Sequence, residues 1–179
     1  MCIRDSSIWV SEQFTRAAPG GTGAAKCGGN YAASLAAQAE AMRQGCDQVV
    51  FLDAVERRWV EELGGMNVFF VFEDGSLQTP PLTGTILPGI TRDSIIRLAR
   101  DAGLTVREEG YAIEQWRADA ASGRLTEAFA CGTAAVVTAI GEVAGADGRF
   151  TIGGGGPGKV TQRIKAELTA IQRLSLIHI

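Results

Sequence analysis

The chain has 179 residues, which is enough for one domain with a hydrophobic core. Apolar residues make up 46% of the sequence and charged residues 21%, the balance of an ordinary globular protein. A net charge of −3 offers no basic surface for nucleic acid or an anionic membrane, and the most apolar stretch, residues 128–141, is too short to cross a bilayer. The cysteines show no CxxC or metal-ligand spacing, so we expect a cytoplasmic protein without a metal site.

The two ends of the sequence are related to each other through the DNA that can encode them. Residues 1–6 and 174–179 can be encoded by strings that are reverse complements, apart from overhanging bases. We interpret both ends as translated sequencing adapter and exclude them, which leaves residues 7–173 as one expected domain. The single histidine, His178, falls in an excluded end, so we expect no histidine-based catalysis.

Strands and helices are mixed along the predicted domain. The hydrophobic pattern predicts, in chain order, a strand at 7–15, a helix at 30–43, strands at 48–53, 59–63 and 66–73, a helix at 91–102, a strand at 104–109, a helix at 113–121, strands at 127–131, 135–143 and 149–152, and a closing helix at 158–174. Asn30 and Thr91 are the expected N-caps of the first two helices. Because several of the strands form antiparallel hairpins, we expect an α/β fold with a mixed sheet and not a doubly wound parallel one.

Lys26 is the residue on which the functional interpretation centres. It lies in the glycine-rich stretch from Gly20 to Tyr31, just ahead of a predicted helix. Most lysines are solvated surface charges. A lysine held in a cleft can instead serve as a Schiff-base amine, if desolvation or a neighbouring cation keeps the amine neutral. Spacing alone leaves both interpretations open.

Three further segments follow Lys26 in order, at residues 61–67, 87–92 and 132–135. In the first, Glu61 and Glu62 lie on a predicted strand and therefore face opposite sides. In the second, the expected helix start offers unpaired N–H groups and a positive dipole end to an anion. Each segment also has an ordinary explanation, namely solvated glutamates, a capped helix after a proline turn, and a strand bend of small residues.

Together, and in this order, the four segments resemble the large domain of the branched-chain amino acid aminotransferases, which are fold type IV enzymes that use pyridoxal 5′-phosphate. The resemblance runs from Ser7 to Arg173 and implies an α/β pseudo-barrel with a mixed sheet. It implies transamination of leucine, isoleucine and valine with 2-oxoglutarate, so branched-chain amino acids and 2-oxo acids are the expected partners, and a homodimer as the full-length form. The family's small N-terminal domain has no counterpart in this sequence, so we expect little activity from the chain alone.

The resemblance also implies roles for residues around the cofactor ring. Lys26 would form the internal aldimine and move the proton between the substrate α-carbon and the cofactor. Glu62 would contact the pyridine nitrogen and keep it protonated, which helps the ring to withdraw electrons. Tyr31 would donate a hydrogen bond to the phenolic oxygen, and Leu87 would pack on the ring.

A second group of residues is implied at the phosphate and the substrate. The backbone amides of Ile90 and Thr91 would bind the phosphate together with Thr133. The amides of Thr133 and Ala134 would face the substrate carboxylate.

Other interpretations stay open beside this one. A D-amino acid aminotransferase or an aminodeoxychorismate lyase would have the same fold type, although the segments at 62–67 and 132–135 favour the branched-chain group. Residues Gly153 to Lys159 satisfy most of the phosphate-loop pattern G-x-x-x-x-G-K-[ST], but Val160 replaces the hydroxyl residue, which leaves a nucleotide-binding module as an alternative. A non-catalytic binding domain is the third.

Overall fold

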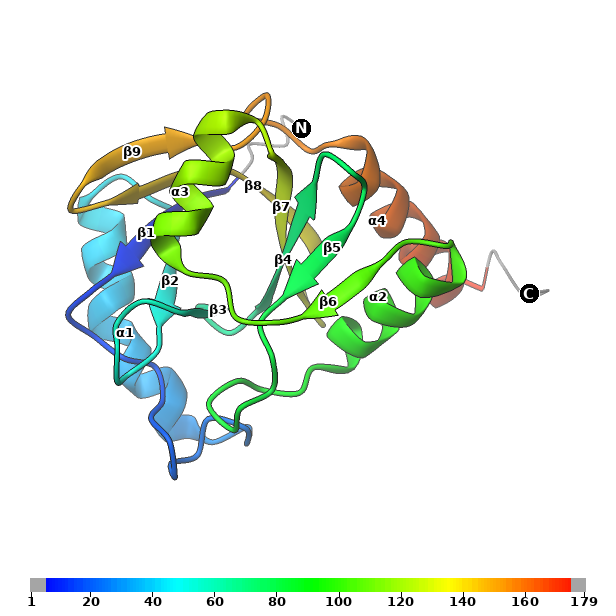
Figure 1. The fold of residues 1–179 in the computed structure, drawn as a ribbon. Helices are drawn as coiled ribbons and strands as arrows, with labels where there is room; N and C mark the ends of the chain where they lie inside the picture. Colours follow the sequence, from blue (N-terminus) through cyan, green and yellow to red (C-terminus); the bar gives the residue numbers. More distant parts are fainter. Residues whose placement is uncertain (1–5, 175–179) are drawn as a thin grey trace.

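The computed structural model describes residues 6–174 and shows a curled, nine-stranded mixed sheet flanked by helices (Figure 1). The strands are β1 (Ser6–Ser11), β2 (Gln48–Leu52), β3 (Val60–Leu63), β4 (Asn67–Phe72), β5 (Leu77–Thr79), β6 (Val106–Glu108), β7 (Leu125–Gly132), β8 (Val136–Gly145) and β9 (Gly148–Thr151). The helices are α1 (Gly28–Arg43), α2 (Ile90–Asp101), α3 (Ile113–Ser122) and α4 (Lys159–Gln172). The interpretation of the two ends as adapter, including His178, falls almost entirely outside the described residues.

The strand order is β3-β2-β1-β8-β7-β4-β5-β6, with β9 beside β8. β1 runs parallel to β2 and β8, and β5 runs parallel to β6, whereas the other pairs are antiparallel. The predicted mixed sheet is therefore confirmed. Backbone hydrogen bonds from Val60 N–H to Tyr111 C=O and from Ile113 N–H to Arg58 C=O tie the β3 edge to the segment after β6. These bonds draw the two edges together and make the sheet a half-barrel.

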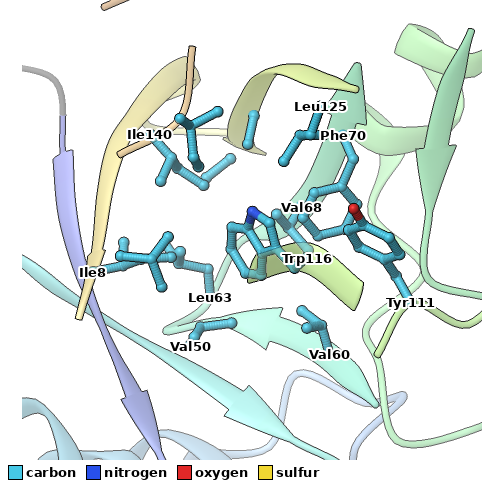
Figure 2. Packing of buried hydrophobic residues seen from close by; sticks show 14 of the residues in the cluster. Ile8, Val50, Val60, Leu63, Val68, Phe70, Tyr111, Trp116, Leu125 and Ile140 are labelled. Atoms are coloured by element: carbon cyan, nitrogen blue, oxygen red, sulfur yellow. The ribbon is translucent and has the colours of Figure 1, made fainter. Parts of the chain in front are cut away.

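Alternation along the strands divides the core between the two faces of the sheet. Val68 and Phe70 of β4 face the concave side, where Trp116 of α3 fills the centre of the half-barrel (Figure 2). Phe69 and Val71 face the convex side, which α2 and α4 cover. A third apolar cluster lies between α1 and strands β1 and β2. The core thus holds β3, β4 and β7 rigidly, and the candidate site lies at the ends of these strands.

Both predicted N-caps are wrong. Helix α1 begins at Gly28 with Cys27 as its N-cap, so Asn30 lies inside the first turn and its side chain reaches back to the preceding loop. Helix α2 begins at Ile90 after Gly89, so Thr91 is already helical. Short polar side chains favour N-caps only on average, and here a tertiary contact decides the position of Asn30. The short strand β5 was not predicted, because its three residues are too few for a periodic signal.

The remaining boundaries lie within a few residues of the predicted ones. Among the described residues, no helix has both the length and the apolar character that crossing a membrane requires.

Candidate functional site

The loop that carries Lys26 is held in shape by Asn30. This asparagine is buried and lies in the first turn of α1. Its Nδ2 donates to the carbonyls of Thr22 at 2.7 Å and Ala25 at 3.0 Å, and its Oδ1 accepts from the Thr22 hydroxyl at 2.8 Å. Lys26 itself is exposed, and none of the hydrogen bonds or ion pairs found within residues 6–174 involves its amine. The backbone around Lys26 is therefore fixed while its side chain is accessible.

Arg16 connects this loop to two other segments of the site. Its Nη1 donates to the carbonyl of Thr85 at 2.9 Å and, more weakly, to that of Gly23 at 3.4 Å. The same nitrogen lies 2.9 Å from the Glu62 carboxylate, and both side chains are almost completely buried. Arg16 was not among the residues predicted from the sequence, and its polar neighbours Gln13 and Thr15 give no local signal that it is buried.

Glu62 is the buried carboxylate that β3 brings to this end of the sheet. It is 1% exposed and also accepts a hydrogen bond from Leu87 N–H at 3.3 Å. Burial raises the pKa of Glu62 to about 7, although Arg16 and the Leu87 N–H both act to lower it. The predicted residues Glu62 and Leu87 are thus in direct contact. No contact between Glu62 and Lys26 is found among the described residues.

Glu61 has different partners from Glu62, as expected for neighbours on a strand. Its carboxylate accepts a hydrogen bond from the Thr85 hydroxyl, and burial raises its pKa. Glu61 lines a cavity of about 450 Å³ together with Trp59 and Ile86, and neither Lys26 nor Glu62 borders this cavity. Both glutamates are buried, so the ordinary explanation of two solvated strand-end glutamates does not hold.

The turn before α2 is fixed by Asn67, at the start of β4. Asn67 Nδ2 donates to the carbonyl of Leu87 at 3.0 Å, and a Cβ atom at Gly89 would overlap the Asn67 side-chain oxygen. The N-terminus of α2 has no side-chain cap, which leaves the first amides of the helix, at Ile90 and Thr91, open to an anion. Asn67 was not predicted as a site residue.

The turn between β7 and β8 lies at the same end of the sheet. Asn67 and Cys131 are paired across β4 and β7, and a Cβ atom at Gly132 would lie 3.3 Å from the Met66 side chain. Thr133 and Ala134 follow in this turn and are both exposed. The structure brings their turn beside the start of β4, but it shows no hydrogen bond between them and the other predicted site residues within the described range.

Tyr31 lies against the turn that joins β3 to β4. A Cβ atom at Gly65 would lie 3.2 Å from the Tyr31 ring, so the ring packs closely on this turn. Tyr31 is 36% exposed, so part of its side chain is accessible. Through Tyr31, Arg16 and Asn67, segments far apart in the sequence meet around the ends of β3 and β4.

The glycine-rich segment before α4 is already occupied by an internal carboxylate. Glu127 of β7 accepts hydrogen bonds from Val160 N–H at 3.0 Å, Thr161 N–H at 2.7 Å and the Thr161 hydroxyl at 2.6 Å. A Cβ atom at Gly158 would overlap the Glu127 carboxyl. Because this carboxylate uses the amides that a phosphate would need, the geometry disfavours a nucleotide site here. No cluster of three or more potential metal ligands is found within residues 6–174.

Comparison with known proteins gives a consistent result. A family model described as amino-transferase class IV matches residues 6–143. The branched-chain-amino-acid aminotransferase of Mycolicibacterium smegmatis is 57% identical over 174 residues, covering 96% of this chain and 47% of that protein. The corresponding protein of Mycobacterium tuberculosis strain H37Rv is 58% identical with the same coverage. The chain therefore spans about half the length of the curated relatives it matches.

Solved structures show the same similarity. The branched-chain amino acid aminotransferase from Escherichia coli is 38% identical with a TM-score of 0.80, covering 94% of this chain and 52% of that one. The branched-chain amino acid aminotransferase from Thermobaculum terrenum, solved in its PLP-form, is 33% identical with a TM-score of 0.80, covering 93% of this chain and 50% of that one.

Proposed function

Because the chain belongs to the class IV aminotransferases, we propose that it is the cofactor-binding part of a branched-chain amino acid aminotransferase. The observation that carries the proposal is the position of Leu87. Its N–H donates to Glu62, and its carbonyl accepts from Asn67 just before the open N-terminus of α2. One residue thus joins a buried carboxylate, suited to a ring nitrogen, to a set of free amides, suited to a phosphate.

The residues present fit pyridoxal 5′-phosphate. Arg16 Nη2 is buried without a hydrogen-bond partner within the described residues, and Glu62 is a buried carboxyl whose pKa is raised to about 7. Both groups can therefore still interact with a polar ligand. Lys26 would hold the cofactor through its amine, Tyr31 and Glu62 would bind the ring, and Ile90, Thr91 and Thr133 would hold the phosphate. When bound, the cofactor withdraws electrons from the substrate α-carbon.

The chain's own groups account for the remaining steps. Glu62 would keep a proton on the ring nitrogen, and Lys26 would take and return the proton at the substrate α-carbon. The backbone amides of Thr133 and Ala134 would orient the substrate carboxylate, while Leu87 would cover one face of the ring.

The proposal extends to the whole protein. Its substrates would be leucine, isoleucine and valine with 2-oxoglutarate, in a cytoplasmic homodimer that serves branched-chain amino acid synthesis. Residues 7–173 would form its large domain. The names of the relatives support this choice over a D-amino acid aminotransferase or an aminodeoxychorismate lyase.

Borohydride reduction in the presence of pyridoxal 5′-phosphate tests the proposal. Peptide mapping of the reduced chain is expected to place the pyridoxyl adduct on Lys26, and Lys26→Ala is expected to abolish it. Lys159 and Lys165 of α4 serve as internal controls, because both are exposed lysines remote from the loop. An adduct that forms equally on these lysines would overturn the assignment of Lys26.

Amino transfer from leucine to 2-oxoglutarate tests the activity of the chain as given. We expect little turnover, because catalysis needs reacting groups held tightly in a site that excludes water, whereas Lys26, Thr133 and Ala134 are exposed here. Strong turnover that disappears in Lys26→Ala would show that this half of the enzyme is sufficient.

A further inference from the structure

Arg16 is a buried cation that the proposed chemistry does not use directly. It lies between β1 and the Lys26 loop and is 4% exposed. Its guanidinium reaches three segments, through Glu62 of β3, the carbonyl of Gly23 in the Lys26 loop and the carbonyl of Thr85. A buried arginine with such a set of acceptors has a fixed position, because every departure from it would leave a buried charge without a partner.

The surroundings of Glu62 make this cation important. A buried carboxylate loses its hydration and is stable only when it is paired and hydrogen-bonded. Glu62 is paired with the Arg16 guanidinium and accepts from the Leu87 N–H. The Glu61 carboxyl, on the other side of the strand, and the Cys131 thiol, whose own pKa burial raises to about 12, are near enough to influence its charge. Of these, Arg16 is the cation, and Glu61 opposes a negative charge on Glu62.

The geometry at Gly23 gives a second and independent observation. A Cβ atom there would lie only 2.5 Å from Thr85 Cα and 2.6 Å from Thr85 C, so two backbones touch at this point. Arg16 donates to the carbonyls on both sides of the contact. The guanidinium therefore holds the Lys26 loop against the Thr85 segment while it binds Glu62.

We propose that Arg16 is the positioning residue of this site: it orients the Glu62 carboxylate, stabilises its negative charge and sets the position of the Lys26 loop relative to it. Its relevance to catalysis rests on the proposed function, since it acts on the groups assigned to the cofactor. All three contacts are made by Nη1, whereas Nη2 is buried without a hydrogen-bond partner among the described residues.

The test uses the cofactor-free chain and follows the carboxyl band of Glu62 by infrared titration, with Glu62→Gln to identify the band. In Arg16→Gln we expect the proton affinity of Glu62 to rise by about 10- to 1,000-fold, the range for removing an adjacent opposite charge. Arg16→Lys keeps the charge and is expected to restore most of the wild-type titration. A folded Arg16→Gln variant whose Glu62 titrates as in the wild type would overturn the proposal.

A second measurement covers the case in which Arg16→Gln does not fold. In the wild-type chain labelled with ¹⁵N-arginine, we expect slowly exchanging guanidinium protons from the two equally buried arginines, Arg16 and Arg92, and only the signals of Arg16 should shift as Glu62 titrates. Glu62→Gln should abolish that shift. A spectrum in which no guanidinium signal follows the carboxyl of Glu62 would overturn the proposal.

Neither measurement needs the cofactor, so the two proposals can fail separately. An adduct on Lys26 with an unchanged Glu62 titration in Arg16→Gln would refute the role of Arg16 alone. A shifted titration without any adduct on Lys26 would refute the proposed function alone.

Discussion

Replacing Gly23 with alanine is expected to push apart the two loops that frame the candidate site. The new methyl group would lie 2.5 Å from Thr85 Cα, whereas ordinary contacts begin at 3.4 Å, so the backbones must separate by about 1 Å. Overpacking of this kind costs about 1–3 kcal/mol. The separation also weakens the hydrogen bonds from Arg16 to Gly23 and Thr85, and bonds from charged donors contribute about 1.5–3 kcal/mol each. We therefore expect Gly23→Ala to lower the free energy of unfolding by about 3–5 kcal/mol.

Urea denaturation followed by circular dichroism measures this loss, and borohydride trapping at Lys26 measures its effect on the site. Gly28→Ala is the matched control, because a Cβ atom at Gly28 meets no heavy atom within 4 Å and the residue opens α1. The control should change the unfolding free energy by less than about 1 kcal/mol, the difference in helix propensity between glycine and alanine. Equal stability of the two variants would refute the close approach of the loops.

Three further predictions concern buried or hydrogen-bonded carboxylates. Glu127→Ala should destabilise the chain by about 3–5 kcal/mol in urea denaturation, because the amides at the N-terminus of α4 lose their acceptor. Glu73 is exposed, so Glu73→Ala should cost less than about 0.5 kcal/mol, and equal costs of the two variants would contradict the prediction. For Asp53, burial acts to raise the pKa, but four backbone N–H groups outweigh it and lower the pKa from 3.8 to about 2. The stability that Asp53 contributes is present above pH 3.8 and is lost as the pH falls through 2. Asp53→Asn should therefore remove up to about 2 kcal/mol of the stability that the wild type loses in acid, measured as the free energy of unfolding against pH. The pH dependence of stability from Glu62 has the opposite sign, because burial raises its pKa from 4.5 to about 7. The stability that comes from protonated Glu62 is present below pH 4.5, and about 3 kcal/mol of it is lost as the pH rises through 7. A Glu62→Gln variant whose unfolding free energy depends on pH as steeply as that of the wild type would refute this.

Local patterns were sufficient to predict most of the fold. Residues 68–72 are all apolar, a run typical of a strand buried on both faces, and the structure places Val68 and Phe70 on the face opposite Phe69 and Val71. Long strands and amphipathic helices carry such signals over many residues. The failures lie at element ends and in short elements: Asn30 hydrogen-bonds back to the Thr22 carbonyl and does not cap its helix, and β5 is too short for a periodic signal.

The candidate site was less accessible to sequence reasoning. Lys26 and Glu62 were proposed from the ordered set of motifs, because spacing alone left each with an ordinary explanation. Arg16 and Asn67 were missed, since their partners, Thr85 and Leu87, are distant in the sequence and only folding reveals the pairs. The glycine-rich segment before α4 was a misleading signal for the same reason, because its partner, Glu127, comes from another strand.

The position of β1 in the sheet has a consequence for how this chain is made. β1 is formed by the first described residues, yet it lies in the interior of the sheet between β2 and β8. During synthesis β2 follows soon, but β8 begins only at Val136, which at about 5–20 residues per second means a delay on the order of ten seconds. For that time one side of β1 presents unpaired backbone groups, a surface on which other chains can add a strand. Chaperones that shield nascent chains would therefore cover this side of β1 until β8 is made.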